Sequence, residues 1–246
     1  MKPESILRHT EHRPFPLPRG PWFMTQTWNH VLFAHWPLPV EALQNHIPSC
    51  LDIDTYEETA WIGILPFFID QFHARFLPPI PRASSFPELN VRTYVKYRGI
   101  PGIYFFSLDA AQLLAVKGAR TFFHLPYFYA EMELDRVDRK NIIFTSKREG
   151  GGSEILLHYR PVSRPFACKK DTLEYWLTER YRLYTTHKKS LYFQDIHHLQ
   201  WPLQRAAASF RKNSAISCIE LPSVSPILHY ADSQKVLFWP MHRIRK

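Results

Sequence analysis

The chain has 246 residues, of which 45% are hydrophobic and 15% aromatic, so it can bury a substantial core and is not a disordered protein. Its formal net charge is +9, yet the 31 lysines and arginines are scattered, and the sequence contains no dense basic helix or nucleic-acid-binding motif. We therefore expect no nucleic-acid partner, and the charge suits a small anionic ligand.

The cysteines and the hydrophobic pattern indicate the compartment. Cys50, Cys168 and Cys218 are odd in number and far apart, which is typical of reduced thiols rather than of disulfides. The first residues are charged and proline-bearing without an apolar leader stretch, and no window approaches the roughly 18 apolar residues of a membrane span. The sequence thus predicts a cytoplasmic protein without a membrane partner.

The first part of the chain is predicted to form an arm followed by strands. Residues 1–21 are polar and then punctuated by prolines, so we expect an irregular arm ahead of a single domain over 22–246. A short helix is predicted between Pro39 and Ile47. Apolar or alternating runs predict strands at 28–36, 51–56, 60–69, 88–97 and 103–108. The third of these is almost continuously apolar, which indicates burial on both faces.

Two segments in the middle of the chain have distinct compositions. Residues 71–87 are rich in proline, and a long loop of this kind in a compact domain is often the lid or rim of a site. Residues 109–123 are rich in alanine and leucine and form the best predicted helix, with Asp109 as its N-cap. Gly118 within this helix indicates a place of close packing.

The second half of the chain again favours strands. They are predicted at 127–134, in a hairpin around Gly150-Gly151-Gly152, in a second hairpin around 187–190, and at 236–239. A second helix is predicted over 172–180, capped by Asp171. No repeat or linker divides the chain, so the pattern predicts one β-rich α+β domain.

The strand Phe86–Val95 has an unusual polar face. Because strand side chains alternate with period 2, Glu88, Asn90 and Arg92 share one face, while the residues between them give an apolar opposite face. If the polar face is buried, the arginine requires a carboxylate partner, which could come from another strand. The alternative is a half-exposed strand whose polar face is solvated.

Several longer motifs resemble those of a known family. They are Phe33-Ala-His-Trp-Pro37, Phe86-Pro-Glu-Leu-Asn-Val-Arg-Thr-Tyr-Val95, Tyr104-Phe-Phe-Ser-Leu-Asp-Ala110, Gly118-Ala-Arg-Thr-Phe-Phe-His-Leu-Pro-Tyr127, Asp195-Ile-His-His-Leu-Gln-Trp-Pro-Leu203 and Leu228-His-Tyr230. In this order they resemble the YqjF-like family of bacterial proteins, a domain of unknown function, over almost the whole chain. That family is similar to acetoacetate decarboxylase, which implies a strongly curved, barrel-like antiparallel sheet with a few helices around a buried pocket, and a homodimer.

The resemblance also shows a chemical departure. In the decarboxylase, a Gly-Arg pair, four further residues, an aromatic residue and Pro precede a Lys-Lys pair that carries the Schiff-base lysine. Here Arg120 is followed at the same interval by Pro126, but Tyr127 and Phe128 replace the lysines. Neither side chain can form an imine, so we expect no imine-dependent decarboxylation. Lys117, the nearest lysine, leaves a retained lysine enzyme as an alternative.

The candidate ligand-binding residues combine the polar strand with the stretch that borders the decarboxylase pocket in the resembling fold. An arginine can hold a carboxylate, tyrosines can donate to a carbonyl or enolate oxygen, and a buried glutamate can move a proton. The alternative is a satisfied polar network that fixes strand packing. The candidates are Glu88, Asn90, Arg92, Asp109, Arg120, Tyr127, Tyr129 and Glu131.

Other kinds of site are poorly supported. Asp195 and His197 share a strand face and could ligate a metal with His158 or His229, but no zinc-type spacing is present and the resemblance implies no metal. No Gly-x-Ser-x-Gly motif and no phosphate-binding loop occur. We therefore expect neither a metal nor a cofactor.

The sequence leaves several functions open. The first is a protein that binds an anionic or aromatic small molecule, with lyase- or isomerase-type activity on a keto or enol acid and without Schiff-base chemistry, because some members of the wider superfamily act on such acids without decarboxylation. The second is a non-enzymatic sensor or carrier of aromatic or apolar compounds, indicated by the aromatic residues between 104 and 127. The third is a structural domain with a filled pocket.

Overall fold

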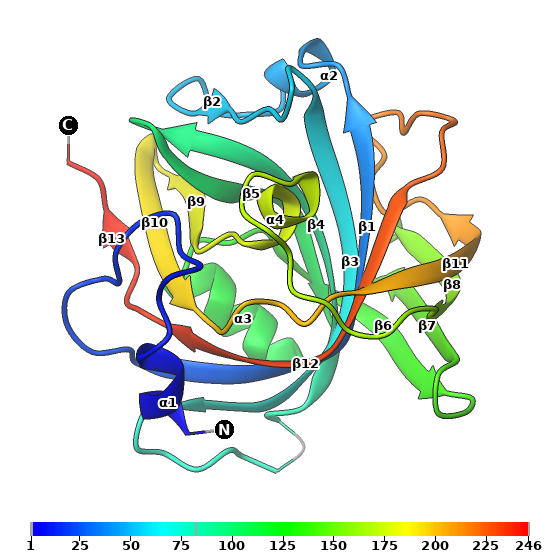
Figure 1. Ribbon diagram of the computed structural model, residues 1–246, viewed down its shortest axis with the longest axis horizontal. Helices are drawn as coiled ribbons and strands as arrows, with labels where there is room; N and C mark the ends of the chain where they lie inside the picture. Colours follow the sequence, from blue (N-terminus) through cyan, green and yellow to red (C-terminus); the bar gives the residue numbers. More distant parts are fainter. Residues whose placement is uncertain (1, 82, 246) are drawn as a thin grey trace.

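A single curved sheet dominates the computed structural model, which describes residues 2–81 and 83–245 (Figure 1). Within this part of the chain the sheet is 13-stranded, in the order β13-β10-β9-β5-β6-β7-β8-β11-β12-β1-β3-β4-β2. The strands are β1 (Met24–Leu38), β2 (Asp52–Ile53), β3 (Ala60–Ala74), β4 (Phe86–Tyr97), β5 (Ile100–Ala110), β6 (Tyr127–Arg136), β7 (Ile142–Arg148), β8 (Glu154–Pro161), β9 (Arg182–His187), β10 (Ser190–His197), β11 (Gln204–Asn213), β12 (Ile227–Phe238) and β13 (His242–Arg243).

Two additional pairings, β10–β12 and β4–β5, close the sheet into two rings with a common wall. We call the ring of β1, β3, β4, β5, β9, β10 and β12 the cavity barrel. The ring of β1, β3, β4, β5, β6, β7, β8, β11 and β12 is called the packed barrel. Figure 1 shows β9 and β10 to the left of β1 and β3, and β6, β7, β8 and β11 to their right. The predicted β-rich, barrel-like α+β fold is confirmed, with parallel β5–β6 and β5–β9 pairings in an otherwise antiparallel sheet.

The common wall presents alternate side chains to the two rings. On β3, Ile62 and Ile64 enter the core of the packed barrel, whereas Leu65 and Phe67 belong to the cluster beside the cavity barrel. This strand is buried on both faces from Ala60 to Phe67, as its continuous apolar run predicted.

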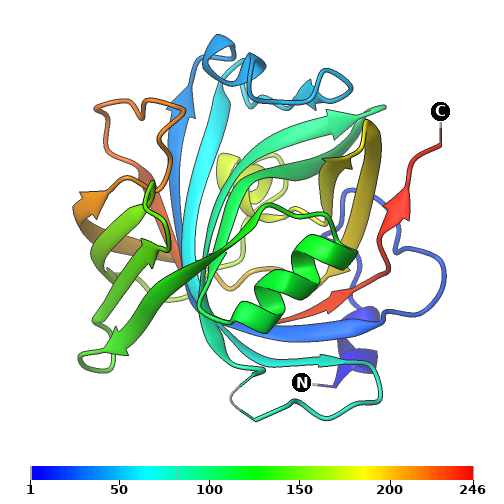
Figure 2. The same ribbon diagram turned by 180° about the vertical axis from the view of Figure 1, so that it is seen from behind.

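Four helices occur in the described part of the chain: α1 (Pro3–Leu7), α2 (Glu41–Gln44), α3 (Leu113–Phe122) and α4 (Leu173–Thr178). The two views place α4 and α3 at opposite ends of the cavity barrel, with α4 in front in Figure 1 and α3 in front in Figure 2. No described helix has the length and apolar character needed to cross a membrane.

The structure corrects several helix and turn boundaries. Asp109 is not an N-cap, because α3 begins four residues later and Gln112 accepts a bond from Leu114 N. The cap of α4 is Thr172 rather than Asp171. The turn between β4 and β5 is the pair Arg98-Gly99, both at positive φ.

The N-terminal arm also departs from the expected irregular segment. It contains α1, and the Ile6 side chain is buried beside Leu237 and Trp239. His12 and Arg13 are buried as well, and Arg13 donates to Ile196 O at 2.7 Å. The arm is therefore packed against the end of β12 and the β10 strand.

Candidate functional site

A cavity of about 550 Å³ lies inside the cavity barrel. Its walls come from the seven strands of that ring, from α3 and from the 77–84 loop, and most lining side chains are aliphatic or aromatic. Leu77, Pro78, Ile80, Ala83 and Ser84 of the proline-rich segment, which was predicted to be the lid or rim of a site, line this cavity. A concave apolar space with a few convergent polar groups is the usual form of a small-molecule site.

The polar face of β4 points into this cavity. Glu88, Asn90 and Arg92 all line it, and none is more than 7% exposed. The opposite face of the strand carries Leu89 and Val91 into the core of the packed barrel. The alternative of a half-exposed strand with a solvated polar face is therefore wrong. Both faces of β4 are buried, the apolar face in the packed barrel and the polar face in the cavity wall.

Glu88 and Tyr127 form a pair in the cavity wall. The Tyr127 hydroxyl donates to Glu88 Oε2 at 3.0 Å. Burial raises the pKa of the Glu88 carboxyl to about 8, an effect only partly opposed by hydrogen bonds from Tyr127 and Asn90. This carboxyl can therefore gain or lose a proton near neutral pH.

Arg92 lacks the carboxylate partner that the sequence analysis required. Among the described residues its one hydrogen bond is Nη2 to Leu177 O, at 3.2 Å, and its Nε has no partner. The nearby buried carboxylate, Asp54, is taken by Arg180 at 2.6 Å and by Lys96 at 2.7 Å. The expectation of an internal salt bridge is wrong, and the Arg92 charge is left uncompensated in the cavity wall.

A second buried arginine reinforces this positive region. Arg180 lines the cavity directly after α4, and its Nη2 has no hydrogen-bond partner. Its guanidinium lies over the rings of Trp176 at 4.2 Å and Tyr94 at 4.8 Å. The sequence analysis missed Arg180 because it placed this residue at the end of a helix, and its partner Asp54 is 126 residues away.

The other candidate residues lie elsewhere. Asp109 is buried in an ion pair with Arg148 at 2.6 Å, Arg120 and Glu131 are exposed, and Tyr129 packs in the cluster beside Val116. None of these four is among the described residues that line the cavity. The structure thus divides the eight candidates into a cavity group, Glu88, Asn90, Arg92 and Tyr127, and a group with other contacts.

The Asp195–His197 pair has structural partners. Asp195 accepts two bonds from Arg182, at 2.6 and 2.8 Å, and His197 Nε2 lies 3.0 Å from Ile6 O. Within residues 2–81 and 83–245, no group of three or more His, Cys, Asp or Glu side chains could hold a metal ion.

The described part of the cavity wall contains no primary amine. Tyr127 occupies the wall and the Phe128 ring lies under the Arg148 guanidinium at 4.0 Å, while Lys117 is exposed on α3. No lysine is among the described lining residues. Among the described lining residues there are groups that can bind an anion and transfer a proton, and none that can form an imine.

Comparison with known proteins agrees with this architecture. The fold is similar to that of an acetoacetate decarboxylase from Legionella pneumophila, with a TM-score of 0.62 and 14% identity, covering 94% of this chain and 93% of that one. It is equally similar to the enduracididine biosynthesis enzyme MppR complexed with pyruvate, with a TM-score of 0.62 and 8% identity over 94% and 92% of the two chains. At these identities the likeness establishes the fold alone.

Sequence similarity defines the family. The uncharacterized protein YqjF of Bacillus subtilis (strain 168) is 55% identical over 231 residues, which are 92% of this chain and 95% of that protein. Residues 25–235 match DUF2071, described as an uncharacterized conserved protein. The chain therefore belongs to the DUF2071 family and has an acetoacetate decarboxylase-like fold.

Proposed function

We propose that the cavity binds a small organic acid with an apolar body, and that the protein moves a proton on a keto or enol group next to the acid's carboxylate. The observation that carries this proposal is Arg92, a buried guanidinium that faces the cavity without a carboxylate partner in the described chain. A buried charge without a partner is costly, and a ligand carboxylate supplies the missing one.

The charges around the cavity fit this ligand. Arg92 and Arg180 both present an unpaired guanidinium nitrogen, and Asp54 already faces Arg180 and Lys96. A ligand carboxylate beside the two guanidiniums offsets part of this positive charge. The apolar wall around it accepts an aromatic or aliphatic body.

The proton step belongs to Glu88. With a pKa raised to about 8, roughly a tenth of this carboxyl is ionised at pH 7. In that form it takes a proton from the carbon next to the ligand carbonyl. The C–H electron pair forms a C=C bond, the carbonyl π pair moves to the oxygen, and transfer of the proton from Glu88 to that oxygen gives the enol. The Tyr127 hydroxyl fixes the orientation of the carboxyl, and the two arginines offset the negative charge of the enolate.

The comparisons support the ligand class. MppR, which shares the fold, was solved with pyruvate, a keto acid, although its identity to this chain is only 8%. The replacement of the lysine pair by Tyr127 and Phe128 argues against decarboxylation through an imine.

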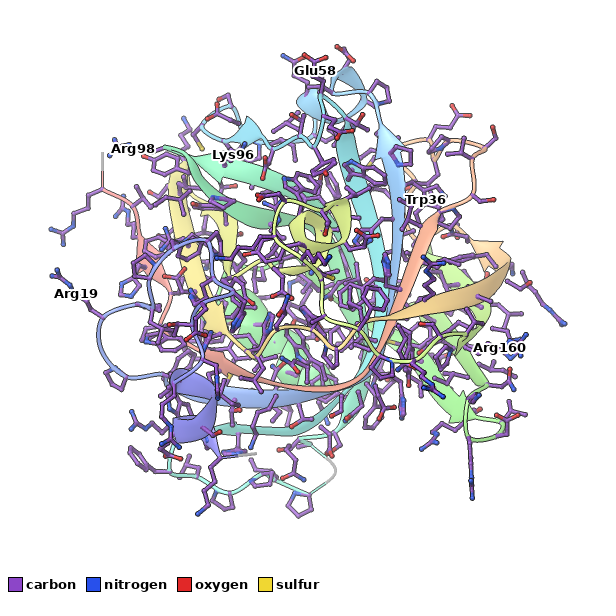
Figure 3. All side chains as sticks on the ribbon, viewed as in Figure 1. Arg19, Trp36, Glu58, Lys96, Arg98 and Arg160 are labelled. Atoms are coloured by element: carbon purple, nitrogen blue, oxygen red, sulfur yellow. The ribbon has the colours of Figure 1, made fainter. Side chains whose placement is uncertain are left out.

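Phenylpyruvate is a suitable probe, because it combines a carboxylate, an enolisable carbon and an aromatic body. We expect titration calorimetry to detect binding and Arg92→Ala to weaken it by about 10- to 100-fold, the range for a lost charged hydrogen bond. Arg98→Ala is the matched control, since Arg98 is exposed on the β4–β5 turn (Figure 3) and is not among the described residues that line the cavity. Equal affinity in all three proteins contradicts the carboxylate site.

The proton step has a separate test. In deuterated water, NMR follows the exchange of the C3 protons of phenylpyruvate, and we expect catalysed exchange that Glu88→Gln lowers by about 100-fold. If Arg92-dependent binding occurs without any catalysed exchange, the second candidate, a carrier or sensor of apolar acids, is favoured. Its supporting observation is the predominantly aliphatic and aromatic cavity wall.

A further inference from the structure

Large apolar side chains are exposed around the mouth of the cavity. Phe76, Leu77, Ile80, Leu114 and Phe122, which we call the mouth surface, are between 62% and 89% exposed. All but Phe76 also line the cavity, so the apolar wall continues to the outside of the molecule. Clusters of exposed apolar side chains mark surfaces that contact another apolar phase or partner.

The two segments that carry these residues are held side by side. At one end of α3, Ala111 N donates to Pro87 O at 3.3 Å. At the other end, the Phe123 ring stacks on Phe23 at 5.9 Å, and Phe23 O accepts a bond from Arg75 N at 2.7 Å. Figure 2 shows α3 in front of the barrel with the 75–85 loop below it.

Phe76 is the most exposed residue of the mouth surface, at 89%. Phe76 adopts a φ of 69°, a left-handed conformation that is unfavourable for a bulky residue. The Arg75 guanidinium lies between the rings of Trp22, at 5.0 Å, and Phe76, at 4.8 Å, which supports this conformation.

The charged side chains of the two segments are all basic. Neither residues 71–87 nor residues 110–130 contain an Asp or Glu, although the chain has 22, and both segments carry cations such as Arg75, Lys117 and Arg120. At the opposite end of the molecule, acidic and basic side chains are mixed, as Glu58 and Lys96 illustrate (Figure 3).

We propose that the mouth surface docks onto an anionic phospholipid bilayer. Phe76, Leu77 and Ile80 enter the boundary between headgroups and acyl chains, while Lys117 and Arg120 contact anionic headgroups. Apolar insertion combined with cationic flanks is how peripheral proteins bind such surfaces. The docked cavity opens toward the bilayer, so an apolar acid can enter it without crossing water.

A second copy of this chain fits the surface less well. A two-fold dimer through the mouth surface brings two copies of these segments together, and the segments carry cations but no carboxylate that could offset them. The sequence analysis expected no membrane partner because it considered only spanning segments, and the mouth surface combines residues from two separate parts of the chain.

Co-sedimentation with vesicles of phosphatidylglycerol and phosphatidylcholine tests the proposal. We expect binding that Phe76→Ser and Leu114→Ser each weaken about tenfold, the loss of one inserted apolar side chain. Lys117→Glu is expected to weaken binding to anionic vesicles severalfold. Val162→Ser, which changes a side chain that is 53% exposed at the far end of β8, is expected to bind like the parent. Circular dichroism confirms that each variant is folded.

Three outcomes overturn the proposal. The first is a parent protein that does not bind the vesicles, and the second is equal binding by all variants. The third is a parent dimer in light scattering that Phe76→Ser converts to monomers, because a second copy then covers the surface. None of these results depends on Arg92 or Glu88, so the proposed ligand chemistry is tested separately.

Discussion

The two barrels share a wall, but one interior is filled by side chains and the other contains a cavity. The packed barrel is filled by apolar side chains such as Ile142, Phe144 and Leu157, all nearly inaccessible to solvent. The cavity barrel keeps an open space of about 550 Å³, and Glu88 and three arginines, Arg92, Arg180 and Arg182, line it. The packed barrel therefore stabilises the fold, because a close-packed apolar interior lowers the free energy of the folded state. The buried charges of the cavity barrel that have no partner raise it.

Strand β4 belongs to both barrels and displays the contrast within a few residues. Its odd-numbered positions, such as Leu89 and Val91, complete the packed core, and its even-numbered positions, such as Glu88 and Arg92, face the cavity. Because this alternation has period 2, one strand can supply stability to one side and chemistry to the other.

The largest expected effect comes from emptying part of the packed barrel. Phe144 is fully buried, so Phe144→Ala is expected to lower the free energy of unfolding by about 3–5 kcal/mol through lost contacts and a new cavity. Guanidinium unfolding measures the loss, and titration calorimetry is expected to show phenylpyruvate affinity within twofold of the parent. A large loss of affinity would show that the two interiors are not independent.

A smaller effect is expected from Glu88 and depends on pH. Its pKa is about 8 in the folded protein against 4.5 ordinarily, so the folded state binds more protons between these values. The free energy of unfolding therefore falls as pH rises from 5 to 8. Glu88→Gln removes this dependence. The unfolding free energy of the variant minus that of the parent is therefore expected to increase by about 2–4 kcal/mol from pH 5 to pH 8.

Urea unfolding at pH 5 and at pH 8 measures this difference. Glu179, whose pKa burial raises to about 7, is present in both proteins and cancels in the comparison. Parallel pH profiles for parent and variant would mean that Glu88 is ionised in the folded protein.

The next effect in size is a gain in stability, which we expect from Arg92→Met. Methionine keeps much of the side-chain volume and removes a buried charge whose one hydrogen bond goes to Leu177 O. We expect the unfolding free energy to rise by about 1–2 kcal/mol, while phenylpyruvate binding weakens by about 10- to 100-fold as in Arg92→Ala. Destabilisation instead would support the alternative of a polar network that fixes strand packing.

The sequence predicted the β4 alternation from a local period-2 pattern and the doubly buried β3 strand from a continuous apolar run, and both signals are local. It could not predict the partners of Arg92. Whether this arginine meets a carboxylate depends on Asp54 and Arg180, which lie far apart in the chain and meet through α4. The Asp109–Arg148 ion pair could not be predicted for the same reason, since it joins the end of β5 to the end of β7.

Gly118 gives the smallest expected effect. The prediction of close packing there is wrong, because a Cβ built on Gly118 meets no atom within 4 Å and points into the open mouth of the cavity. Gly118→Ala is therefore expected to raise the unfolding free energy by about 0.5–1 kcal/mol through helix propensity alone. Gly102→Ala is the matched contrast, since its Cβ would lie 2.6 Å from the Tyr184 ring and 2.8 Å from Arg182 O, and we expect destabilisation. A destabilised Gly118→Ala would mean that α3 closes onto the 75–85 loop in solution and that the mouth is not open.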